Sequence, residues 1–183
     1  MEYLDDEGLP RVLDFLDAPY GLRKEHVRAL APMFSVTDSN DKDTGAVFRV
    51  MHPLHTLMSR VHNTANLPGY ETPHALKQLR VSVDALRAFI ERWLLAEGET
   101  RGALKLIKQL YRFSHQSSAA LIVFQRHSID IFSAAPSHRE GLPKEYEERS
   151  YPQMRDWLRR RRERWSRPGA ERPSSFERLP RRS

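Results

Sequence analysis

The chain contains no cysteine among its 183 residues, which excludes disulfide bonds, zinc–thiolate sites, iron–sulfur clusters and cysteine nucleophiles. It also lacks long hydrophobic runs. The longest uninterrupted apolar segment covers residues 119–124, whereas a helix that spans a bilayer needs about 20 apolar residues. Residues 1–7 are acidic, which is untypical of a signal or transit peptide. We therefore expect a cytoplasmic protein that makes no membrane contact.

Motifs for catalysis are scarce as well, and no glycine-rich phosphate loop occurs. His127, Ser128 and Asp130 are the three residue types of a catalytic triad, but they stand too close in sequence for triad geometry. The glycines of a nucleophile elbow are also missing. His52 and His55 lack a nearby carboxylate that would complete a metal site. The residues alone thus indicate no catalytic centre.

The charge is unevenly distributed along the chain. Thirty basic and 24 acidic residues give a net charge of +6. Residues 154–183 hold eleven arginines, no lysine and four acids, a net charge of +7, so residues 1–153 carry −1. The basic character therefore belongs to the C-terminal segment.

Hydrophobic periodicity predicts a short mixed segment followed by a helical one. Strands are predicted at residues 9–16 and 46–51, with a helix at residues 24–30 between them. Further helices are predicted at residues 53–66, 73–95, 117–127 and 153–165, and another begins at Thr100. The clearest pattern lies in residues 73–95, where apolar residues recur every three or four positions, as in a helix that packs against other helices.

The predicted fold class is mainly α. A small two-stranded α/β remnant in residues 1–51 precedes a helical bundle in residues 52–165, and residues 166–183 form a disordered arginine-rich tail. Two strands alone do not make a stable sheet. The N-terminal segment is therefore predicted to be the edge of a larger sheet or to recruit a partner chain.

Two polar surfaces are candidates for binding. His55, Ser59, His62 and Asn66 share one face of the helix at 53–66 and could form the wall of a polar groove or a solvated face. Arg60, beside Arg80 and Arg87 on the next helix, could clamp a phosphate. The alternative is that these arginines only lie on a solvent-exposed outer face of the helix.

The second candidate surface is the arginine-rich C-terminal helix. Its arginines could neutralise a nucleic-acid backbone while an indole stacks on bases. Alternatively, the helix is a docked last element held by Trp157 and Leu158. The residues predicted to bind RNA or DNA are Arg159, Arg160, Arg161, Arg162 and Trp165.

Several short strings, taken together, resemble a known family. In their order they are similar to the C-terminal two-thirds of bacterial nucleotidyltransferase-like proteins, loosely of the abortive-infection toxin type. The resemblance covers residues 10–165. The strings are residues 13–16 (LDFL), 20–22 (YGL), 50–63 (VMHPLHTLMSRVHN), 78–83 (QLRVSV), 126–130 (RHSID) and 151–154 (YPQM).

The resemblance implies a small catalytic sheet followed by a helical domain that recognises substrate. It places Asp14 at a Mg²⁺ site, and Arg60, Asn63, Gln78 and Arg80 in contact with a nucleotide or at an interface between helices. The family's Gly-Ser motif and paired acids are absent here, and one carboxylate cannot hold the metal and align a triphosphate. The chain is thus predicted to be inactive alone, to use Mg²⁺ only if a core is supplied, and to be the back part of a longer or mis-started protein.

Three functions remain open at this point. The first is a substrate-recognition and interaction module of a nucleotidyltransferase-like system. The second is a nucleic-acid-binding module that acts through the arginine-rich segment. The third is an interaction protein of the toxin–antitoxin type, which binds a partner or a second copy through its helices or an exposed sheet edge.

Overall fold

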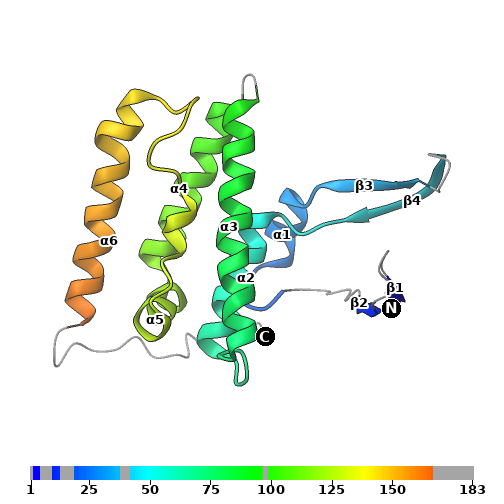
Figure 1. Ribbon diagram of the computed structural model, residues 1–183, viewed down its shortest axis with the longest axis horizontal. Coiled ribbons are helices and arrows are strands. Elements are labelled where there is room, and N and C mark those ends of the chain that lie inside the picture. Colours follow the sequence, from blue (N-terminus) through cyan, green and yellow to red (C-terminus); the bar gives the residue numbers. More distant parts are fainter. Residues whose placement is uncertain (1, 5–9, 13–18, 38–41, 97–98, 167–183) are drawn as a thin grey trace.

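The computed structural model describes residues 2–4, 10–12, 19–37, 42–96 and 99–166, and the predicted mainly α fold is confirmed (Figure 1). The bundle contains α2 (Pro53–Asn66), α3 (Pro73–Leu95), α4 (Thr100–Gln116), α5 (Ser118–His127) and α6 (Tyr151–Trp165). A 3₁₀ helix, η1 (Ile131–Ala134), and a π-helical turn, η2 (Tyr146–Ser150), lie between α5 and α6. The N-terminal elements are β1 (Glu2–Leu4), β2 (Pro10–Val12), α1 (Lys24–Leu30), β3 (Met33–Thr37) and β4 (Asp43–Arg49).

Helix α3 packs against α2, α4 and η1 and has the bounds that its sequence predicts. Thr72 caps its first turn, with the Ala75 N–H donating to Thr72 Oγ1 at 3.2 Å, and Pro73 fits the first helical position. Its apolar stripe is buried, with Leu86 and Ile90 fully enclosed. The 3–4 spacing therefore marks the core-facing side of this helix.

Helix α5 explains the longest apolar run of the chain. Residues 119–123 are buried on several sides of the helix, between α2 and α4. Ser117 caps the helix start, and Ser128, with a φ of 55°, ends it in the left-handed conformation. Among the described helices, none has both the length and the apolar composition needed to cross a membrane.

The N-terminal strands form two separate pairs. Strand β2, within the predicted strand at residues 9–16, pairs with β1, and β4, which overlaps the predicted strand at 46–51, pairs with β3. Both pairs are antiparallel. Strand β3 was not predicted at all. Each strand pairs with its neighbour in sequence because closing a short loop costs less entropy than closing a long crossover.

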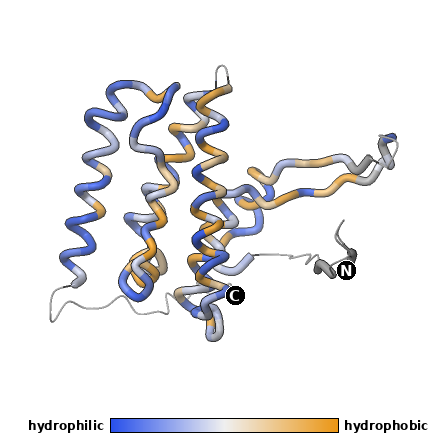
Figure 2. The backbone as a smooth tube through the Cα atoms, viewed as in Figure 1, coloured by the Kyte–Doolittle hydropathy of each residue, from blue (hydrophilic) through white to orange (hydrophobic). Residues whose placement is uncertain are grey.

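The β3–β4 hairpin forms an arm that extends away from the bundle (Figure 1). Figure 2 shows hydrophobic residues along both strands of this arm. The arm is attached to the bundle through α1 on one side and through α2 on the other. Asp14 and residues 167–183 of the predicted tail lie outside the described residues.

Candidate nucleic-acid interface

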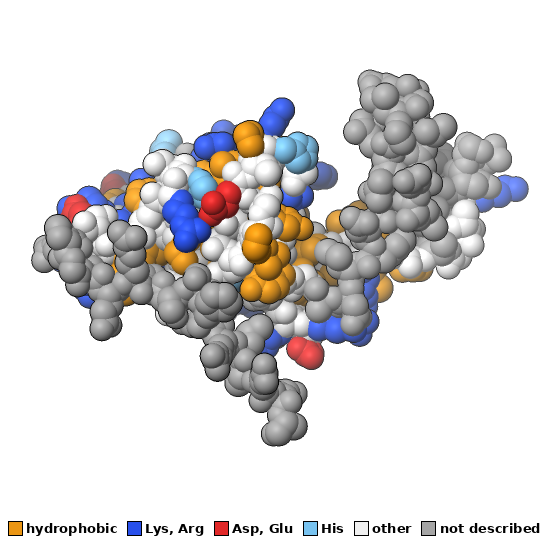
Figure 3. Space-filling view, turned by 90° about the horizontal axis from the view of Figure 1, so that it is seen from below, with side chains coloured by type: hydrophobic (Ala, Val, Ile, Leu, Met, Phe, Trp, Pro, Cys, Tyr) orange, Lys and Arg blue, Asp and Glu red, His pale blue; other side chains and the backbone are white. Residues whose placement is uncertain are grey.

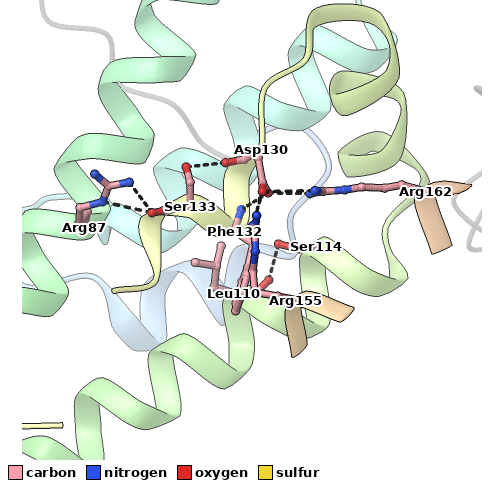
Figure 4. A network of polar contacts seen from close by, with 8 residues as sticks. All are labelled: Arg87, Leu110, Ser114, Asp130, Phe132, Ser133, Arg155 and Arg162. Carbon is pink, nitrogen blue, oxygen red and sulfur yellow. Dashed lines mark hydrogen bonds and ion pairs between the residues drawn. The ribbon is translucent and has the colours of Figure 1, made fainter. Parts of the chain in front are cut away.

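Asp130 is the centre of a polar network that joins η1 to α6 (Figure 4). Arg162 Nη2 donates to Asp130 Oδ1 at 2.6 Å, and Arg155 donates to Asp130 Oδ2. The Phe132 N–H also donates to Asp130 Oδ1, at 3.1 Å, and so starts η1. Burial would raise the pKa of Asp130, but the hydrogen bonds and charges of Arg162 and Arg155 outweigh it and lower the pKa. Asp130 is therefore a charged anchor for α6.

Two of the arginines predicted to bind nucleic acid are used within the fold. Arg162 ion-pairs with Asp130, and its guanidinium carbon lies 3.7 Å from the centre of the Phe124 ring. Arg161 Nη1 donates to the carbonyls of Ser114 and Ser117, at 3.2 and 3.4 Å. The Ser114 carbonyl belongs to the last turn of α4, where helical partners are missing, and Ser117 is the residue that joins α4 to α5. Arg161 and Arg162 therefore hold α6 to the bundle.

The other predicted arginines of α6 have acidic neighbours on the same helix. Arg159 Nη1 lies 2.7 Å from Glu163 Oε1, and Arg160 Nε lies 2.7 Å from Asp156 Oδ2. Trp165 is half-buried. An open groove of about 770 Å³ beside Phe124 is lined by Arg155, Arg159 and Arg162 together with Asp156 and Glu163, so its charges are largely balanced.

Helix α4, unlike α6, has an exposed row of basic side chains without acidic neighbours on the same helix. Arg101, Lys105, Lys108 and Arg112 are exposed and recur at intervals of four, three and four, which places them on one side of the helix. The opposite side is the buried stripe that contains Leu106 and Leu110. No acidic residue occurs between Thr100 and Gln116. Within the described ranges, none of the four cations has an acidic partner.

Several charged side chains elsewhere on the bundle have neighbours of the opposite charge. On the face shown in Figure 3, the few acidic side chains lie beside basic or histidine side chains. One ion pair of this type joins Arg126 Nη1 to Glu71 Oε1 at 2.7 Å. The stripe of α4, in contrast, consists of basic side chains alone.

An aromatic group adjoins this stripe where α4 meets α6. The rings of Tyr111 and Trp157 are 6.1 Å apart, and Trp157 is 44% exposed. His115, one turn after Tyr111, has its pKa lowered by burial and then by the charges of Arg161 and Arg164. We use the name α4–α6 face for Arg101, Lys105, Lys108, Arg112, Trp157 and Arg164.

The sequence pattern of α4 could have revealed the stripe. Four cations at positions i, i+4, i+7 and i+11 opposite an apolar stripe are visible without a structure. The candidate nucleic-acid site was predicted on α6 instead, because its arginine run is denser.

The predicted nucleotide site is assembled only in part. Arg60 Nη1 donates to Gln78 Oε1 at 2.6 Å, which joins α2 to α3. Asn63 Oδ1 is buried and has no hydrogen-bond partner in the described structure, and Arg80 is exposed. Arg87 was expected to join Arg60 and Arg80 in a phosphate clamp. It instead donates to the Ser133 carbonyl, at 3.1 Å from Nε (Figure 4).

The histidines of α2 are core residues. His52 and His55 are buried, so the polar groove wall expected at His55 and Ser59 is not present. His52 Nδ1 accepts the Leu54 N–H at 3.1 Å and caps α2. Burial, and then the neighbouring His55, lower the pKa of His52 to about 4. Across the described residues, no group of three His, Asp or Glu side chains could hold a metal ion.

Comparisons with protein-family models, with curated proteins and with solved structures find no match to this chain. The resemblance to nucleotidyltransferase-like proteins stays a prediction. Function is therefore inferred from the geometry of the described residues.

Proposed function

We propose that this protein binds single-stranded nucleic acid through the α4–α6 face. The observation that carries the proposal is the row of four exposed cations on α4, a helix without a single acid. At 1.5 Å per residue, the row from Arg101 to Arg112 is about 17 Å long. Such a row can neutralise several phosphates of one strand and release their counterions.

The accessible indole favours a single strand over a duplex. Trp157 is held by Tyr111 at the edge of the cationic row, with part of its ring exposed. An unpaired base can stack on such a ring, and this contact contributes about 1–3 kcal/mol. In a duplex the bases are already stacked on each other, so the indole would add little.

The test is the fluorescence anisotropy of a labelled single-stranded RNA, titrated with the full chain at several salt concentrations. The double variant Lys105→Glu/Lys108→Glu should weaken binding at least tenfold. It should also reduce the slope of log K against log salt by about 1.4, because each lost phosphate contact removes about 0.7.

The matched control makes the same charge change on another helix. Lys77 and Arg92 are exposed on α3 and stand outside the α4–α6 face. The double variant Lys77→Glu/Arg92→Glu should bind nearly as well as the original chain. Equal weakening by both double variants would mean that only net charge matters, and the proposed site would be wrong.

A second candidate function is supported by one contact. The Arg60–Gln78 hydrogen bond brings together two of the residues that the family resemblance assigns to a nucleotide. We propose, as the alternative, a nucleotide-recognition module that is inactive without a catalytic core. Calorimetric titration with ATP and Mg²⁺ should then show saturable binding that Arg60→Ala removes, and an absence of heat would count against it.

A further inference from the structure

One histidine lies at the edge of the α4–α6 face and is positioned there by a ring contact. The ring of His115 stacks on the ring of Tyr111, with centres 5.5 Å apart and an angle of 29° between the ring planes. Tyr111 also contacts Trp157, at 6.1 Å between ring centres. His115 and the exposed indole therefore both pack on Tyr111, where α4 meets α6.

The ring nitrogens of His115 are available to a ligand. Within the part of the chain that the structure describes, neither nitrogen forms a hydrogen bond or an ion pair, and neither is a buried atom without a partner. Two exposed histidines elsewhere differ in this respect. His74 is hydrogen-bonded to Gln78 at 2.8 Å, and His138 Nδ1 lies 2.7 Å from Glu147 Oε1. An imidazole with both nitrogens free can donate to an incoming group.

The charged neighbours of His115 among the described residues are basic. From α4, Lys108 and Arg112 share its side of the helix, and that helix contains no acid. From α6, the charges of Arg161 and Arg164 lower the pKa of His115, after the larger effect of its burial. The first two turns of α5, which follow it in the chain, contain no titratable side chain. A negative group that arrives here therefore meets only positive charge.

Hydrogen bonds hold one of these charges in place. The guanidinium of Arg161 donates to the carbonyls of Ser114 at 3.2 Å and Gln116 at 3.4 Å, the two residues on either side of His115 in the sequence. Arg164 is exposed and follows about one turn later on α6. This end of the α4–α6 face thus combines two guanidinium groups with an imidazole, which is the donor chemistry of a phosphate-binding site.

We propose that His115 binds a phosphate of the nucleic-acid strand and takes up a proton when it does so. The inference rests on the proposed function and adds to it a further contact residue and a pH dependence. In the free chain, the two arginines disfavour a third positive charge. A bound phosphate reverses this effect, because an opposite charge favours the imidazolium, which forms the stronger, charge-assisted hydrogen bond. Tyr111 stays neutral, since burial raises its pKa.

The affinity for nucleic acid should therefore rise as the pH falls. Above about pH 7.5 the imidazole is neutral in the free chain and in the complex, so binding exchanges no proton. At lower pH the complex binds more protons than the free chain, and the proton and the strand strengthen each other's binding by the same factor. We expect a gain of about fivefold between about pH 7.5 and pH 5.5, at the lower end of such couplings.

The test is the fluorescence anisotropy of a labelled oligouridine, titrated with the full chain at pH values from about 7.5 to 5.5. Uracil does not titrate in this range, so the probe itself adds no pH dependence. His115→Gln keeps a side-chain donor but cannot be protonated, and it should remove most of the gain. His115→Arg is always charged, so its affinity should already be high at pH 7.5 and stay nearly constant. Circular dichroism at each pH checks that the helix content is retained.

The matched control is His138→Gln, because His138 already has Glu147 as an acidic partner and is not part of the α4–α6 face. This variant should show the same gain as the original chain. Two results would overturn the inference and leave the proposed function intact. One is RNA binding by the original chain that does not change with pH, and the other is a gain that is as large in His115→Gln. An absence of RNA binding at every pH would overturn the proposed function and this inference with it.

A second measurement observes the proton directly. The ring-proton NMR signal of His115, assigned by its loss in His115→Gln, gives the midpoint of its titration. This midpoint should lie below 6.5 in the free chain and move upward when oligouridine is added in excess. A midpoint that is the same with and without RNA would overturn the proposal, even if the affinity changes with pH.

Discussion

Helices α4 and α6 both carry many cations, but those of α6 bind to groups within the protein and those of α4 are exposed. On α6, Arg155 and Arg162 clamp Asp130, and Arg161 donates to carbonyls at the end of α4. On α4, Lys105 and Lys108 face solvent, with no acidic partner in the portion of the chain that the structure describes. The longer basic run therefore serves the fold, whereas the sparser one stays exposed to solvent.

The difference shows that the density of charge does not identify a binding surface. What matters is whether the neighbours of a cation already balance it. A guanidinium that is hydrogen-bonded and partly buried contributes to stability, while an exposed, unbalanced cation contributes to long-range attraction. Substitutions can separate the two roles. A cation that stabilises the fold should lower the free energy of unfolding when it is replaced, whereas a cation that attracts a ligand should lower the binding affinity.

The largest expected effect comes from removing the anchor of α6. Asp130→Ala leaves two partly buried guanidinium groups without their carboxylate and should lower the free energy of unfolding by about 3 kcal/mol. Thermal and urea unfolding followed by circular dichroism would measure it. Asp130→Asn keeps a side-chain oxygen that can accept from the Phe132 N–H, so it should lower the free energy of unfolding by less. If Asp130→Ala is as stable as the original, α6 is not held in this way.

Acid should produce the next largest effect. The pKa of His52 is about 4 in the folded chain and near 6.5 when unfolded, so protons favour the unfolded state. Stability is full above pH 6.5 and falls as the pH drops from 6.5 to 4. The difference between the two pKa values corresponds to a loss of about 3 kcal/mol in the free energy of unfolding. Partial solvation of His52 reduces this loss to about 2 kcal/mol.

Urea unfolding at a series of pH values measures this loss. Because Asp130 has a lowered pKa, its carboxylate stays charged through the window and does not contribute. His52→Asn preserves a side-chain acceptor for the cap of α2 and cannot be protonated, so it should make the pH profile less steep. His55 and His115, whose pKa values burial also lowers, account for the slope that remains. A profile that stays equally steep in this variant would exclude His52 as the cause.

A smaller effect is expected for the indole at the junction of the two helices. Trp157→Ala should weaken the binding of single-stranded RNA by about 1–2 kcal/mol, because it removes one stacking platform. Trp157→Phe should retain much of the affinity. Binding by the two variants would be compared by anisotropy, with duplex RNA as the second ligand. Equal losses for the single strand and the duplex would argue against stacking.

The smallest effect is expected for the outer arginines of α6. Arg159→Ala and Arg160→Ala break exposed ion pairs with neighbours on the same helix, which contribute little to stability. Unfolding and RNA binding should both stay close to those of the original chain. A loss of affinity as large as that of Lys105→Glu/Lys108→Glu would remove the distinction between α4 and α6.

The helices could be predicted from the sequence because their signals are local. Thr72-Pro73 and the 3–4 repeat give the bounds of α3 without reference to any other element. The helix expected at residues 117–127 forms as Ser118–His127 for the same reason. The expected start at residue 153 was two positions late, because α6 follows η2 without a break.

The candidate site was predictable only in part. The sequence contains the four cations of α4, and their common face follows from the helical repeat. Their lack of acidic neighbours depends on which helices pack beside α4. The contact between Arg60 and Gln78 could not be read from spacing along one helix, because it joins two helices.

The sequence by itself determined the helices, their buried stripes and the absence of disulfide chemistry, because propensity, capping and periodicity act over a few residues. Tertiary structure decided which arginines Asp130 balances and which cations of α4 stay without an acidic neighbour. Those outcomes depend on groups far apart in the chain, such as Asp130 and Arg162. Only the packing of the helices brings such groups within hydrogen-bonding distance.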